Sequence, residues 1–443
     1  MSAPRLESPN PAATAVPVYL PLGFIVAGIA GMLLLVLALP GTLPSAAVYV
    51  RHHARLLVLV HLFTLVWGSG VTLGVLHQMA PVILCAPLHS VRLGWLALGL
   101  YVPGSFLFAL SFRSFWLAGV IAGGVLVLAA SLAFAYNIAR TAGSARERNV
   151  TTRFLVPAIL SFAGTLALGI AMAASVRLGA GYTVTKGLLL AHLFLGGAGW
   201  FTGIIIATAY RLVPMFLLVH GHGEGAAGRI LAVHYAGVAL GVAGSLRGGP
   251  HGAAAGALLI LAAVAMWARD LASMWKKRVR PPDVWMHQVP VAAAFMVASA
   301  AGAAACAVWN AAQGGVHPRV MLAVGVLFSL GGVSVIVLAL LHKIVPFLVW
   351  CHRCGDAAGR GRAPAMKDLV NERIGTVAFP VFEAAVVVIA AGVALDEVIL
   401  AQAAAWALAL ACAFLVHDLI GLIAPAGALN IRRARGKVRE EVR

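Results

Sequence analysis

Long apolar segments with few charges recur along the whole chain, and they constrain the fold more than any other feature. Only 10% of the 443 residues are charged, whereas an ordinary soluble domain has about 25%. So few charges cannot cover a globular surface with polar side chains. We therefore expect an integral membrane protein. The apolar fraction and the five cysteines exclude a disordered chain and a secreted disulfide scaffold.

Twelve segments are long and apolar enough to be transmembrane helices. They lie near residues 17–40, 56–81, 91–112, 114–139, 154–176, 187–218, 230–247, 252–272, 287–312, 320–350, 375–395 and 398–428. The pattern predicts an all-α membrane protein with a tail at 1–16, one twelve-helix domain at 17–428 and a basic tail at 429–443. The first segment lacks the features of a cleaved signal peptide, so we expect it to be retained.

The basic residues indicate how the chain is oriented in the membrane. The formal net charge is +18, and 25 of the 32 Lys and Arg residues fall in the tails and in the loops on the same side as the tails. Because cytoplasmic loops carry the excess of Lys and Arg, we expect both termini to be cytoplasmic. The positive charge then reflects topology and contact with anionic lipid headgroups of the bilayer. We do not expect a nucleic-acid partner.

A threefold internal repeat organises the segments. The prolines Pro81, Pro214 and Pro346 end similar segments near 56–81, 187–218 and 320–350, and they are 133 and 132 residues apart. A polar ring stands four residues before each proline and a small residue seven before; the rings are His77, Tyr210 and His342, and the small residues are Gly74, Ala207 and Ala339. The repeat predicts three four-helix arcs around three inner helices, whose small residues permit close packing.

Two histidines stand at similar depth in the first two repeat segments. His61 follows Arg55, and His192 follows Lys186 by the same number of residues. Imidazole nitrogen is a ligand for haem iron, copper and zinc. The two rings could bind one haem from opposite faces, occupy separate pockets, or be packing histidines bonded to carbonyls.

The twelve segments, their cytoplasmic termini and the three arcs resemble the catalytic subunit of haem-copper oxidases and nitric oxide reductases. The second segment, with His61 near one end and a proline at the other, is similar to the family helix that supplies a low-spin haem ligand. His192 is similar to the family's first copper-ligand histidine. The seventh segment carries only His234 where the family has adjacent histidines. The tenth has no histidine in the matching stretch, 323–327.

The resemblance therefore implies a divergent member of this superfamily, in a prokaryotic inner membrane. It implies haem b held by His61, with His192 and His234 as further cofactor-binding residues, and copper as an additional cofactor. The implied function is respiratory electron transfer or the handling of oxygen or nitric oxide. A cytochrome or quinol electron donor and partner subunits would follow from the same resemblance.

A second set of metal-ligating side chains lies at the cytoplasmic ends of the repeat segments. It includes His77, His342, Cys351, His352 and Cys354. The last three lie in the C-H-R-C stretch at 351–354. The C-x-x-C spacing can chelate copper(I) or zinc or form a redox pair. A solvated helix end with incidental thiols is the alternative. If a metal binds, the chain could instead be a metal transporter or insertion factor; a cofactor-free transporter is a third reading.

Two polar groups within the apolar segments are candidates for a proton path. Glu383 stands near the middle of the eleventh segment, and Tyr210 stands near the end of the sixth. Buried polar and ionisable groups in the membrane are costly and are often functional. The alternative for Glu383 is a protonated acid that is hydrogen-bonded between helices.

Overall fold

A computed structural model describes residues 16–46, 54–144, 150–179, 182–223, 225–358 and 369–423, without the side chains at 44–46, 182–185 and 354–358. Its helices before residue 180 are α1 (Tyr19–Ala46), α2 (Ala54–His61), η2 (Leu62–Ser69), α3 (Gly70–Leu84), α4 (Val91–Ser111), η3 (Phe112–Ser114), α5 (Leu117–Gly143) and α6 (Val150–Arg177). The remaining ones are α7 (Tyr182–Leu193), η4 (Phe194–Thr202), α8 (Gly203–Leu217), α9 (Gly225–Leu246), α10 (Pro250–Lys276), α11 (Val284–Gln313), α12 (Pro318–Val326), η5 (Leu327–Ser334), α13 (Val335–Ala358), α14 (Glu372–Leu395) and α15 (Val398–Ile423).

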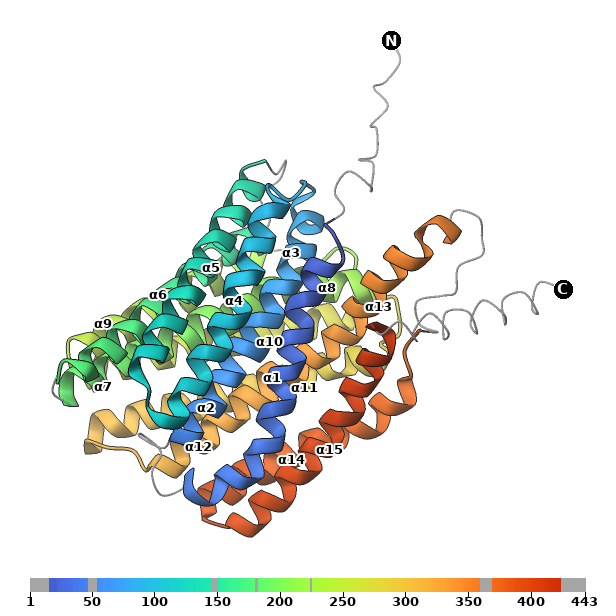
Figure 1. Ribbon diagram of the computed structural model, residues 1–443. Helices are drawn as coiled ribbons and strands as arrows, with labels where there is room; N and C mark the ends of the chain where they lie inside the picture. Colours follow the sequence, from blue (N-terminus) through green and yellow to red (C-terminus); the bar gives the residue numbers. More distant parts are fainter. Residues whose placement is uncertain are drawn as a thin grey trace.

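Twelve helical stretches of the described chain are long and apolar enough to cross a membrane. They coincide with the twelve predicted segments, so the all-α transmembrane class is confirmed. All-round apolar helices have no water-facing stripe, which suits a lipid surround. The bundle is drawn in Figure 1, with the first described helix, α1, packed along the last, α15. The predicted tails, 1–16 and 429–443, lie outside the described residues apart from Val16.

Neighbouring outer helices pack against one another in chain order. The most extensive contacts join α9 to α10, α4 to α5 and α14 to α15, and α10 continues onto α11. Each repeat segment is a composite helix that runs straight through a π-helical stretch: α2–η2–α3, α7–η4–α8 and α12–η5–α13. We call these the inner helices. Their contacts with α1, α6 and α11 favour the three-arc arrangement, which stays a prediction.

The three π-helical stretches occur at the same place in each inner helix. They start at Leu62, Phe194 and Leu327, which are 132 and 133 residues apart. The repeat prolines have nearly the same spacing, 133 and 132 residues. A π-helix widens the turn and is frequently found at functional sites. The stretches contain glycines that let side chains of other helices approach closely. A Cβ on Gly68 would lie 2.6 Å from Cε1 of Phe201. The regular repeat predicted from the prolines is therefore present in the backbone.

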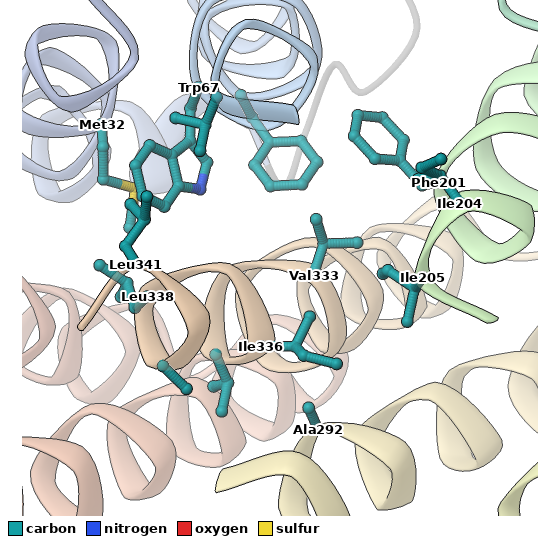
Figure 2. Packing of buried hydrophobic residues seen from close by; sticks show 14 of the residues in the cluster. Met32, Trp67, Phe201, Ile204, Ile205, Ala292, Val333, Ile336, Leu338 and Leu341 are labelled. Atoms are coloured by element: carbon teal, nitrogen blue, oxygen red, sulfur yellow. The ribbon is translucent and has the colours of Figure 1, made fainter. Parts of the chain in front are cut away.

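Two buried tryptophans link the inner helices by hydrogen bonds. Trp67 Nε1 donates to Ser334 Oγ at 3.1 Å, and Trp200 Nε1 donates to Ser69 Oγ at 2.8 Å. The donors stand fourteen residues and the acceptors twelve residues before their repeat prolines. Each bond therefore joins equivalent positions of two different inner helices. Figure 2 shows Val333 pointing from its helix toward the space between the helices that carry Trp67 and Phe201.

The third position of this hydrogen-bond pattern is Gly332, which has no donor. A Cβ there would lie 2.8 Å from Cγ of Met296, so the methionine occupies the space. Thr202, the acceptor expected for a third tryptophan, donates to Gly197 O at 3.0 Å instead. The repeat is thus complete in its backbone and incomplete in its side chains.

We expect Ser69→Ala to lower the free energy of unfolding by about 1–2 kcal/mol, because it leaves the buried Trp200 Nε1–H without its acceptor. Unfolding in bicelles, followed by tryptophan fluorescence, measures the change. Ser131→Ala is the matched control, since Ser131 Oγ bonds only Val127 O of its own helix, at 2.7 Å. Equal losses in the two variants would contradict a role for the interhelical bond.

Candidate functional site

We distinguish two ends of the bundle. The proline end is where α3, α8 and α13 lie, and it includes Pro81 and its two repeat equivalents. The opposite end is where α2, α7 and α12 begin. At the opposite end these three helices are largely part-exposed, whereas α3, α8 and α13 are largely buried. The inner helices are therefore more accessible at the opposite end than at the proline end.

His61 lies at the opposite end, at the junction of α2 and η2. Its Nδ1 is 2.8 Å from Leu57 O, and because a carbonyl only accepts, Nδ1 must carry the hydrogen. The ring is stacked on Phe112 with centroids 4.7 Å apart, and Phe108 meets its edge at 5.0 Å. These contacts hold the ring and assign the lone pair to Nε2. A metal approaches in the plane of the ring, so stacking on its face does not block Nε2.

His192, on α7, is held in the same way. Its Nδ1 is 2.9 Å from Thr165 O of α6, so this ring also keeps its lone pair on Nε2. A Cβ on Gly169 would lie 3.3 Å from Cε1 of His192, so the glycine makes room for the ring. Both imidazoles are half-buried, and they interact electrostatically with each other. The two histidines that the sequence placed at equal depth thus lie within electrostatic range of each other.

His234 is arranged differently. It lies on α9 and is fully buried; its Nε2 is 3.0 Å from Ala198 O of η4, and Tyr235 meets its ring at 4.9 Å. Its Nδ1 is buried with no hydrogen-bond partner among the described residues. Its free nitrogen is thus Nδ1, in closed surroundings. Cofactor binding by His234 stays a prediction.

The three polar rings at the proline end each stack on an aromatic ring from the first helix of their own repeat unit. The pairs are His77 on Phe24 at 5.3 Å, Tyr210 on Phe154 at 6.4 Å, and His342 on Trp285 at 4.0 Å. The aromatic partners are themselves 130 and 131 residues apart. The repeat therefore extends to side-chain contacts between neighbouring helices.

Two of these rings also face a carboxylate from the last helix of their unit. Tyr210 Oη donates to Asp270 Oδ2 of α10 at 2.7 Å. His342 Nε2 lies 3.9 Å from Asp418 Oδ2 of α15, while its Nδ1 bonds Leu338 O. In the first unit the corresponding neighbour of His77 is Phe134, at 5.1 Å. The proline end thus holds two ring–carboxylate pairs within apolar helices.

Sequence reasoning missed Asp270 as a functional residue. The available signal was an aspartate near the end of a long apolar segment in a chain with only 14 acidic residues. Its partner His222 was also missed as a functional residue; it stands in the loop after α8 and places Nε2 3.3 Å from Asp270 Oδ1. A loop histidine gives no periodic signal, so its contact with α10 could not be predicted.

The predicted metal site is not assembled by the described residues, which contain no group of three His, Cys, Asp or Glu side chains able to hold a metal. Cys351 and His352 are exposed, and the ring of His352 lies 5.7 Å from that of Tyr19. The side chain of Cys354 lies outside the described residues. His77 and His342 are held in separate units. The copper or zinc site stays a prediction.

Glu383 is half-buried on α14, and its Oε1 is buried without a hydrogen-bond partner among the described residues. The predicted proton path through Glu383 therefore gains no continuation in the structure and stays a prediction. Tyr210, the other predicted member, has the hydrogen bond to Asp270.

No protein-family model matches the chain, and a search of curated proteins also gives no match. The fold and its contacts define a polytopic α-helical membrane protein with an internal repeat, carrying a histidine pair at one end and ring–carboxylate pairs at the other.

At the proline end, Lys343 forms an ion pair with Asp283. Asp283 also caps the N-terminus of α11, because its Oδ1 accepts a hydrogen bond from Met286 N at 3.0 Å. Asp283→Asn keeps a capping oxygen and removes the charge. Because the pair is only about one quarter exposed, we expect a loss of about 1–2 kcal/mol of unfolding free energy. Thermal unfolding in detergent and in bicelles measures it.

Asp396→Asn is the control for this prediction. Asp396 pairs with Arg319 at 2.7 Å but is 47% exposed, so water screens the pair, and its loss should cost below about 1 kcal/mol. Asparagine also tolerates the left-handed φ of +69° at this position. A larger loss for Asp396→Asn than for Asp283→Asn would refute the assignment.

Proposed function

We propose that this protein binds haem b in the membrane through His61 and His192, and that it belongs with the haem-copper oxidase catalytic subunits as a divergent relative. The observation that carries the proposal is the matching tautomer of the two rings. Each donates from Nδ1 to a backbone carbonyl of a helix and keeps Nε2 available. Histidines that bind metals characteristically have the second nitrogen held in this way.

The surroundings of the two histidines support the same proposal. They come from α2 and α7, which belong to different repeat units, so a planar group between them would be held by two rigid elements. The helices around them are part-exposed at this end and closed at the proline end. Within the described residues, neither Nε2 has a recorded hydrogen-bond partner.

When bound, haem supplies reversible one-electron chemistry at its iron, with a potential that axial ligands and burial tune. Haem held by both His61 and His192 would be suited to electron transfer rather than to the binding of a gas. The part played by the chain is to hold the two imidazoles through Leu57 O and Thr165 O, and to stack Phe112 on the face of His61. These contacts fix the orientation of both rings before any ligand arrives.

The proposal includes a respiratory role in a prokaryotic inner membrane, with both termini cytoplasmic and the proline end facing the cytoplasm. The clustering of basic residues in the loops at that end supports this orientation. A membrane quinol or a cytochrome would be the electron donor, and partner subunits would pack on the outer helices.

The visible spectrum of the purified protein tests the haem proposal. We expect Soret and alpha bands of a low-spin haem b, and a loss of the low-spin bands in both His61→Ala and His192→Ala because either variant removes one axial ligand. His251→Ala is the control; His251 is an exposed histidine at the same end of the bundle. Pyridine haemochrome spectra give the haem type and content.

Three results would contradict this assignment. They are a protein without haem when expressed in haem-sufficient cells, low-spin bands that persist in either ligand variant, and equal losses in the His251→Ala control. A spectrum that changes to high-spin in one variant and is unaffected in the other would instead place the two histidines in separate pockets.

A further inference from the structure

The loop between α8 and α9 folds the ring of His222 against α10. The side chain of His222 is only 9% exposed, although its loop follows the end of the membrane-spanning helix α8. Gly221, with φ of +65°, allows the turn that brings the ring inward. His220, two residues earlier, is exposed. The chain thus buries one of two neighbouring histidines and leaves the other in solvent.

Asp270 has a separate partner for each carboxylate oxygen. Oδ1 lies 3.3 Å from Nε2 of His222, and Oδ2 accepts the hydrogen bond from Tyr210 Oη at 2.7 Å. The carboxylate is 13% exposed, and it lies between the loop on one side and an inner helix on the other. A carboxylate in this position within apolar helices is costly and is by default a functional group.

Both ring nitrogens of His222 are buried without a hydrogen bond among the described residues, and Nε2 faces Asp270 Oδ1 at 3.3 Å. His77 and His342, also buried, each bond Nδ1 to a carbonyl of their own helix. His222 is therefore left with an unused nitrogen on one side and a carboxylate on the other. That is the arrangement in which an imidazole can take up a proton at one nitrogen and release one from the other.

We propose that His222, Asp270 and Tyr210 form a proton-exchange site at the proline end of α8. In uptake, a hydronium ion that reaches the loop gives its proton to Nδ1 of His222 and leaves as water, while the proton on Nε2 passes to Oδ1 of Asp270; release reverses both transfers. Only N–H and O–H bonds form and break, and no electron moves. Asp270 is the proton acceptor and His222 the carrier. Tyr210 is a positioning residue, because its hydroxyl holds Oδ2 and directs Oδ1 toward His222.

The charged groups around this site are cationic. Lys277, directly after α10, donates to Gly221 O at 3.4 Å and so reaches the same loop. Exposed basic residues stand on each helix packed around the site, namely Arg153 of α6, Arg211 of α8, Arg229 of α9, and Arg269 and Lys276 of α10. On α11, His287 is bonded to Asp283 O, and Asp283 is paired with Lys343.

Infrared spectroscopy after a pH jump tests the proposal on the full-length protein in nanodiscs, with or without haem. The Asp270 carboxyl band is identified by its absence in Asp270→Asn. Acidification should protonate Asp270 rapidly in the native protein. In His222→Gln, which keeps a polar side chain of similar length but does not titrate near neutral pH, we expect protonation to slow by roughly a hundredfold, the lower end of the contribution of a positioned proton donor.

Two further variants separate proton transfer from a structural effect. His220→Gln should leave the rate unchanged, because His220 is exposed. His222→Gly should be slow, and imidazole added to the buffer should restore its rate. Tyr210→Phe should keep exchange and shift the Asp270 carboxyl band, as expected for the loss of the hydrogen bond to Oδ2.

The proposal is overturned if Asp270 does not change protonation, if His222→Gln reacts as fast as or faster than the native protein, or if imidazole does not rescue His222→Gly. Because no step of this experiment requires haem, its failure leaves the histidine pair at the opposite end untouched, and failure of the haem assignment leaves this site untouched.

Discussion

The structure depends on the hydrogen bonds that join the inner helices through buried tryptophans. In lipid, apolar side chains gain little by leaving the solvent, so helices associate through close packing and interhelical hydrogen bonds. Trp67 and Trp200 supply both, since each buries a large ring and places Nε1 on a serine of the next inner helix. Glycines such as Gly68 allow the backbones to approach. The closed region of the inner helices follows from these contacts.

This closed region separates two environments along the inner helices. On one side, α2 and α7 are part-exposed and carry His61 and His192; on the other, α3, α8 and α13 are buried and carry the ring–carboxylate pairs. Between these two environments, Trp67 and Trp200 are almost fully buried.

Most of the fold could be predicted from the sequence because membrane helices need long apolar runs, and the prolines marked the repeat. The sequence also placed His61 and His192 at equal depth by their distance from Arg55 and Lys186. Spacing alone could not show which nitrogen of each histidine is free, because that depends on carbonyls such as Thr165 O on another helix. The π-helical stretches and the contact of His222 with Asp270 could not be predicted from the sequence for the same reason, because both depend on tertiary neighbours.

The third repeat unit lacks several side chains that the other two have. Its inner helix has no histidine in the stretch matching His61 and His192, and Gly332 replaces the tryptophan. The mean hydropathy of this span is 2.6, against 2.0 and 1.8 for the other inner helices. It keeps Ser334, which accepts from Trp67, and the stack of His342 on Trp285. The third inner helix is therefore mainly a packing partner, while the first two carry the histidines for which a cofactor is proposed.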